Sequence, residues 1–147
     1  MPEDERNNDF DRIGKAYVTP IPKTDEAGNA TINNDTLRVR YVVHAVGPDC
    51  RDHEENKNRK TLLGNAYRNS LLQADKVGVT SIAFPAISTA IFKYPIKEAT
   101  EVALDSILDT AKRTSIKHIL CMFLPNDTSG GYDRYIDYLD KKSAQEK

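Results

Sequence analysis

The fold of this 147-residue chain is decided by residues 81–95, which read SIAFPAISTAIFKYP. The first four residues form a short apolar run that Pro85 ends, a pattern typical of a buried strand. A long apolar loop follows, and Pro95 suits the first turn of a helix, where a missing backbone N–H costs nothing. A buried strand, a long loop and a helix in this order indicate one unit of an α/β fold whose loop carries function.

The same alternation extends to both sides of this stretch. In chain order we expect strands at 15–19 and 37–46, a helix from 63, the strand at 81–84, a helix from 95, a strand at 118–123 and a helix from about 132. Such alternation predicts parallel strands joined by right-handed crossovers. In the last helix, Tyr132, Tyr135, Ile136 and Leu139 share one face and are expected to pack in the core.

Composition predicts one domain over residues 13–142, with a flexible tail at 1–12 and a second tail at 143–147. The net charge of −1 gives no reason to expect binding to nucleic acid or to an acidic membrane. No apolar run approaches the roughly 20 residues of a membrane span, and the acidic start does not resemble a secretory signal. Cys50 and Cys121 are interpreted as reduced thiols of a cytoplasmic protein.

Ligands of open α/β sheets bind beyond the carboxyl ends of the strands. Ser88 and Thr89 follow such an end, close to the helix that begins near Pro95. Their hydroxyl or backbone N–H groups are therefore candidates to bind a phosphate group. The alternative is an ordinary strand-to-helix turn in which the hydroxyls bond locally.

Three stretches carry a family resemblance: residues 41–48 (YVVHAVGP), residues 62–71 with Tyr67 near their centre, and residues 81–95. Together they resemble the macrodomain family, which binds ADP-ribose and related nucleotides. The resemblance covers about residues 14–139. It implies a three-layer α/β/α fold with a mixed, mostly parallel sheet, from which the family's opening strands are missing.

The phosphate loop departs from the family pattern at two positions. The family reads S-T-G-I-aromatic-G-aromatic-P, whereas Ala90 and Lys93 stand here where the two glycines belong. A Cβ at Ala90 would crowd a diphosphate, because glycine permits a closer backbone approach. Lys93 either strains the turn or compensates by pairing its ammonium group with a phosphate, and the sequence leaves both alternatives open.

The family's opening section is the second departure. Members resemble one another in an acidic residue that recognises adenine, an N-A-A-N stretch and a glycine-rich loop, and this chain contains neither an N-A-A-N nor a triple glycine. Because de-ADP-ribosylating members use that asparagine and that loop, we expect no hydrolase activity from this chain and assign no catalytic residue. We also expect no cofactor, and no metal, since Cys50 with His53 and His118 with Cys121 form only loose pairs.

The resemblance and the strand ends together implicate eight ligand-binding residues: Pro48, Ser88, Thr89, Ala90, Ile91, Phe92, Phe123 and Asn126. Phe92 resembles the family's aromatic residue at the distal ribose, but it also fits a plug in the core. Phe123, or Leu124 beside it, matches a residue that contacts adenine, or is simply the last apolar residue of its strand. Asn126 fits a ligand contact or turn chemistry. His44 is expected to be a buried structural histidine.

Three functions remain open. The first is a non-catalytic module that binds ADP-ribose, or an ADP-ribosylated protein, and neither nucleic acid nor membrane. The second is an interaction or scaffold protein that uses an exposed sheet edge to pair with another chain or to form a homo-oligomer. The third is an ADP-ribosyl hydrolase that a missing segment or another chain completes.

Overall fold

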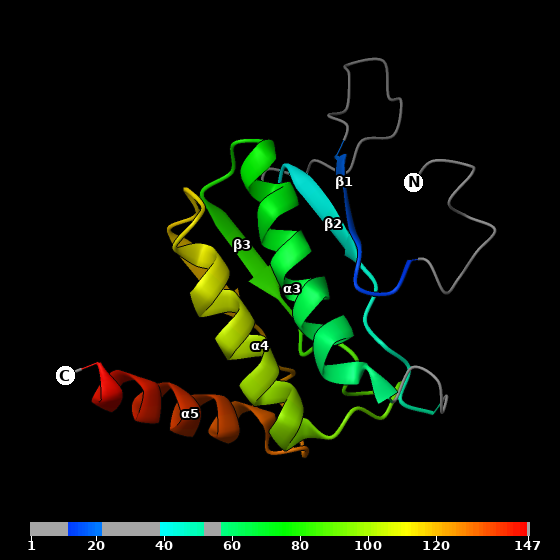
Figure 1. Ribbon diagram of the computed structural model, residues 1–147, viewed down its shortest axis with the longest axis vertical. Coiled ribbons are helices and arrows are strands. Elements are labelled where there is room, and N and C mark those ends of the chain that lie inside the picture. The colour runs from blue at the N-terminus through cyan, green and yellow to red at the C-terminus, as the bar shows by residue number, and fades with distance from the viewer. Residues whose placement is uncertain (1–11, 22–38, 52–56, 147) are drawn as a thin grey trace.

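The chain alternates strands and helices as the sequence predicts (Figure 1). The computed structural model describes residues 12–21, 39–51 and 57–146. Its elements are β1 (Ala16–Pro20), β2 (Tyr41–Ala45), α3 (Arg59–Lys76), β3 (Ser81–Phe84), α4 (Ile96–Ala111), β4 (His118–Cys121) and α5 (Gly131–Gln145). The α/β class is confirmed. Most of the expected tail at 1–12, the start of the second expected strand and His53 lie outside the described residues.

The described strands form two separate pairs. β1 is antiparallel to β2, with Ala16 opposite Ala45, and β3 is parallel to β4, with Ser81 opposite His118. β2 and β3 point in the same direction in Figure 1, but no described backbone hydrogen bond joins them. The described sheet is therefore divided between β2 and β3, a division that periodicity along single strands cannot reveal.

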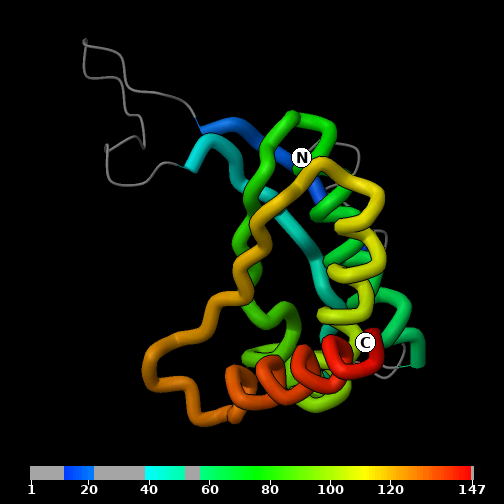
Figure 2. The backbone as a smooth tube through the Cα atoms, turned by 90° about the vertical axis from the view of Figure 1, so that its left-hand side faces the viewer, coloured from blue at the N-terminus to red at the C-terminus, as the bar shows by residue number. Residues whose placement is uncertain are grey.

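The helices cover one face of the strands. α3 and α4 pack against each other on that face, and α5 packs against α4 (Figure 2). The core between these elements contains the buried side chains of Leu63, Tyr67, Leu71, Ala74, Phe84, Tyr94, Ala99, Ala103, Leu104, Ile107, Ile116 and Tyr135. No described helix covers the opposite face, so Val42, Leu120 and Met122 remain exposed there. No described helix is both long and apolar enough to cross a membrane.

Helix α5 buries less than its sequence predicts. Tyr135 is buried, but Tyr132 is 60% exposed, Ile136 42% and Leu139 38%, so the expectation that this face packs in the core is wrong for three of its four residues. The physical reason is that α5 contacts the body along one narrow stripe, and an apolar spacing does not reveal how wide the facing surface is. The helix also continues to Gln145, beyond residue 142.

Tyr67 joins α3 to the carboxyl end of β3. Its ring packs against Phe84 with the centroids 5.1 Å apart. Its hydroxyl accepts a hydrogen bond from the N–H of Ile87 at 3.0 Å and donates to the carbonyl of Pro85 at 3.3 Å. Burial raises the pKa of Tyr67 to about 12, although the hydrogen bond from Ile87 acts in the opposite direction.

This pKa makes stability depend on alkaline pH. Between pH 10 and 12 the tyrosine ionises in the unfolded chain but not in the folded one, so the folded state holds one more proton. The free energy of unfolding should therefore fall by about 1.4 kcal/mol per pH unit from this residue alone. At pH 8 the free energy of unfolding of the Tyr67→Phe variant should be about 1–3 kcal/mol lower than that of the unmodified protein. Between pH 10 and 12 the free energy of unfolding of this variant should then decline less steeply than that of the unmodified protein.

Urea unfolding at pH 8, 10 and 11 measures this difference in slope. The control is Tyr132→Phe, a residue of α5 that is 60% exposed, and this variant should follow the unmodified protein throughout. Equal slopes for Tyr67→Phe and the unmodified protein would contradict the assignment of the alkaline decline to Tyr67.

Candidate functional site

The carboxyl ends of β2 and β3 meet in one surface. A Cβ placed on Gly47, just after β2, would overlap the Oγ of Ser88 and would lie 2.5 Å from Cγ2 of Ile87. The N–H of Cys50 donates to the carbonyl of Phe92 at 2.8 Å. Glycine at position 47 therefore allows the segment after β2 to pack directly against the loop at residues 88–92, which we call the 88–92 loop.

Two residues of this region have backbone conformations that favour glycine. Ser88 has φ +66° and Lys93 has φ +59°. The turn closes on itself, because the N–H of Tyr94 donates to the carbonyl of Ser88 at 2.9 Å and that of Lys93 to Ala90 at 3.2 Å. Lys93 therefore strains the turn, as one of the two sequence alternatives expects, while Ala90 is not in the left-handed region.

The top of the loop presents unpaired donors. The backbone N–H groups of Ala90, Ile91 and Phe92 have no acceptor among the described residues. Ile91 is 72% exposed, so this part of the loop lies at the surface. Three successive N–H groups in a turn form a concave site of the kind that binds anions.

The two hydroxyls of the loop differ in their partners. Thr89 Oγ1 donates to the carbonyl of Ala86 at 2.8 Å, which is the local bond that an ordinary turn would have. Ser88 Oγ is buried and has no hydrogen-bond partner among the described residues. An unsatisfied buried hydroxyl costs about 1–3 kcal/mol. Strain and an unsatisfied group at one residue are typical of a functional site.

Positive charge and aromatic surface flank the loop. The guanidinium of Arg51 lies 5.5 Å from the centroid of the half-buried Phe92 ring. Arg51 also forms an ion pair with Asp49 at 2.6 Å, and its side-chain hydrogen bond lowers the pKa of that carboxyl. Lys93, in the same turn, is exposed. Two basic residues therefore flank the 88–92 loop, and one of them is paired with Asp49.

A second ion pair holds the start of α4 against α3. Arg59 binds Glu98 at 2.6 Å and lies 5.4 Å from the centroid of the buried Tyr94 ring. Burial acts to raise the pKa of Glu98, but the hydrogen bond and the positive charge of Arg59 act in the opposite direction, and the pKa is lowered. Glu98 therefore stays ionised and fixes the helix that follows the loop.

The structure separates the remaining predicted ligand residues. Pro48 is fully buried, so its side chain offers no surface to a ligand. Phe123 packs edge-on against Tyr132 and Tyr135, with centroids 6.0 and 4.9 Å away. Asn126 is exposed in the turn that follows. Five of the eight predicted ligand residues therefore lie together in the 88–92 loop. Phe123 instead packs against α5.

Other expectations need correction or addition. His44 is exposed rather than buried, and its Nε2 lies 2.8 Å from Thr19 Oγ1. Cys50 and Cys121 are not joined by a disulfide, and the described residues contain no cluster of three or more His, Cys, Asp or Glu side chains. Sequence reasoning did not single out Gly47 or Arg51 as parts of the site. For Gly47 the available signal was its place directly after a strand.

The chain is similar in sequence to known proteins. The sequence model of the Macro domain matches residues 16–103. A macro domain-containing protein of Caldanaerobacter subterraneus subsp. tengcongensis is 36% identical over 115 residues, which cover 78% of this chain and 65% of that protein. An O-acetyl-ADP-ribose deacetylase of Escherichia fergusonii is 39% identical over 101 residues, which cover 68% of this chain and 56% of that enzyme.

Solved structures show the same fold. The Oceanobacillus iheyensis macrodomain with ADP matches with a TM-score of 0.69 and 26% identity, over 95% of this chain and 68% of that one. The Trypanosoma brucei macrodomain in complex with ADP-ribose matches with a TM-score of 0.55 and 28% identity, over 70% of this chain and 41% of that one. This chain therefore spans about two thirds or less of the length of these proteins.

The close approach of Gly47 to the loop predicts a coupling between two residues. Gly47→Ala should lower the free energy of unfolding by about 1–3 kcal/mol, because the added methyl group has no room beside Ser88 and Ile87. In a Ser88→Gly background the same substitution should cost less, since the overlapping hydroxyl is gone. Urea unfolding of the four proteins of this cycle measures the coupling, and strict additivity would contradict the contact.

The strain at Lys93 predicts a stabilising substitution. Lys93→Gly should raise the free energy of unfolding by about 1 kcal/mol, because glycine adopts positive φ without a Cβ clash. Lys93→Ala is the matched control, since it removes the same side chain but keeps the Cβ, and it should bring no gain. Thermal unfolding compares the three proteins, and equal gains from both substitutions would trace the effect to charge instead.

Proposed function

Because the chain belongs to the macrodomain family, we propose that it is a module that binds ADP-ribose or a related nucleotide at the 88–92 loop. The observation that carries the proposal is the row of three N–H groups of Ala90, Ile91 and Phe92 without acceptors. They lie just before the amino-terminal end of α4, where the helix dipole also favours negative charge. The diphosphate of ADP-ribose is an anion that suits such donors.

The side chains around the loop fit the rest of such a ligand. The hydroxyl of Ser88 is a further donor of this loop that no described residue uses. Phe92, with Arg51 beside it, offers an aromatic surface to the distal ribose. Phe123 and Asn126 at the end of β4 are proposed for the adenine end. Lys93 supplies a cation at the rim of the loop.

We propose further that this chain binds the ligand without hydrolysing it and acts in the cytoplasm. The N-A-A-N stretch and the glycine-rich loop of de-ADP-ribosylating macrodomains are absent from the sequence. A relative named O-acetyl-ADP-ribose deacetylase has over two fifths of its length outside the matched region, since the match covers 56% of that protein. Release of acetate from O-acetyl-ADP-ribose, lost on mutation of the 88–92 loop, would contradict a purely binding role.

Calorimetric titration with ADP-ribose tests the binding role. Ile91→Pro removes one N–H of the row, whereas the matched control Ile91→Ala keeps that N–H and removes the same exposed side chain. We expect saturable binding that Ile91→Pro weakens about tenfold, the value of one hydrogen bond to a charged group. Ile91→Ala should bind like the unmodified protein.

Equal weakening by both variants would contradict anion binding by the backbone. Absence of heat at millimolar ADP-ribose would contradict the binding role altogether. A concentration-dependent dimer in ultracentrifugation would then favour the second candidate, an interaction or scaffold protein. Its supporting observation is the uncovered sheet face with exposed Val42, Leu120 and Met122.

A further inference from the structure

The strand β2 has one unpaired edge. The N–H of Ile21 donates to the carbonyl of Arg40 at 2.9 Å, and that of Val46 donates to Lys15 at 3.2 Å, so the even-numbered residues of this strand direct their backbone groups toward β1. Successive residues of a strand point these groups to opposite sides. The N–H and C=O groups of Tyr41, Val43 and Ala45 therefore point toward β3, and no described residue pairs with them.

The strand β3 has an unpaired edge that faces the first. The carbonyls of Thr80 and Phe84 accept hydrogen bonds from Lys117 and Met122, each at 2.7 Å, on the side of β4. Ser81 and Ala83 consequently direct their backbone groups to the opposite side, toward β2. Two parallel strands thus present rows of unpaired donors and acceptors to each other across a gap.

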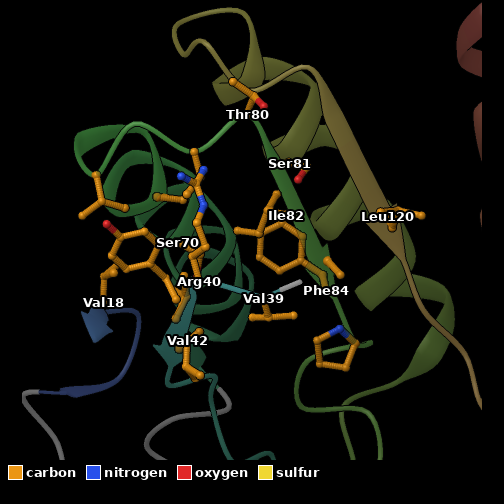
Figure 3. A pocket seen from close by; sticks show the side chains of 18 of the residues that line it. Val18, Val39, Arg40, Val42, Ser70, Thr80, Ser81, Ile82, Phe84 and Leu120 are labelled. Carbon is orange, nitrogen blue, oxygen red and sulfur yellow. The ribbon is translucent and has the colours of Figure 1, made fainter. Parts of the chain in front are cut away.

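The gap is a real cavity. It has a volume of about 600 Å³ and is lined by residues of both strands, as Figure 3 shows for Val42 on one side and Ile82 and Phe84 on the other. Small side chains of α3, Ser70 and Ala74, also line it and leave room for larger side chains. Apolar walls and two hydrogen-bonding edges match an extended peptide strand, because only a peptide backbone repeats donors and acceptors at the spacing of a sheet.

A charge at one end of the gap indicates the direction and chemistry of the occupant. Arg40 lines the cavity at the amino-terminal end of β2, is exposed, and forms no ion pair with any described residue. A strand inserted parallel to β2 and β3 would have its own amino-terminal end beside this guanidinium. An acidic residue at that end would pair with it.

We propose that the gap between β2 and β3 binds one extended polypeptide strand from outside residues 1–147, inserted parallel to both. Its residues are apolar and β-branched, and an acidic residue precedes them. The similar solved macrodomain has about a third of its length without a counterpart here, since the match covers 68% of that chain. This favours further polypeptide over a small apolar molecule as the occupant. The inference is independent of ADP-ribose binding.

Fluorescence anisotropy with a labelled peptide, Glu-Thr-Val-Ile-Val-Thr-Lys-Lys, tests the proposal. We expect saturable binding to the 147-residue protein. The same peptide with proline in place of its isoleucine should bind at least about tenfold more weakly, because proline removes a strand N–H. Equal binding of the two peptides would show that apolar contact alone holds them, and would overturn strand insertion.

Protein variants locate the binding. Ala83→Pro removes an N–H that faces the gap, while the matched control Ala83→Val keeps it and changes only an exposed side chain. We expect about a tenfold loss of affinity for Ala83→Pro and none for Ala83→Val, with circular dichroism confirming that both fold. Arg40→Glu should weaken binding of the parent peptide and should restore affinity for a peptide that begins with lysine. This exchange of charges would establish that the peptide binds in the parallel direction.

Two other results would overturn the proposal. No anisotropy change at millimolar peptide, for a protein that is monomeric in ultracentrifugation, would show that the gap accepts no strand. No peptide binding by a protein that dimerises, with a dimer that Ala83→Pro dissociates, would identify a second copy as the occupant. Calorimetry with ADP-ribose on the same samples tests the proposed function separately, so a failure of strand binding is distinguished from a failure of ADP-ribose binding.

Discussion

Helix α3 holds together two sheets that share no described backbone hydrogen bond. One of its faces packs against β1 and β2, and it also packs against α4, the helix that connects β3 to β4. Tyr67 on this helix bonds the backbone on both sides of Ala86, directly after β3. In a continuous sheet, ladder hydrogen bonds would fix the relative position of β2 and β3. Here side-chain packing on one helix fixes it instead.

The conformation of the 88–92 loop depends on this packing. Because α3 sets β2 beside β3 with their carboxyl ends at one edge, Gly47 comes into contact with Ser88 and Cys50 bonds Phe92. The loop is then held in a conformation with positive φ at Ser88, in which the N–H groups of Ala90, Ile91 and Phe92 have no acceptor among the described residues. A local strain that a free loop would relax is maintained by the close approach of a second segment.

Local patterns predicted the elements well and their surroundings less well. The apolar period of α3 and the β3 strand at residues 81–84 agree with the structure, because both depend on the residues' own spacing. The exposure of His44 and of Tyr132 was missed, since a period says which residues share a face but not what covers it. An exposed sheet edge was expected, but its place at Val43 and Ala83 was not, because strand neighbours are chosen over long distances.

The sequence by itself determined the α/β class and the macrodomain family, and it predicted the 88–92 loop as the place for a ligand, because these depend on local order and on residue types. Only the tertiary structure decided that the hydroxyl of Thr89 donates to a carbonyl within the turn, that Pro48 is buried and that Phe123 packs against α5. It also decided that a gap separates β2 from β3. Such features depend on contacts between distant segments, which no single stretch of sequence specifies.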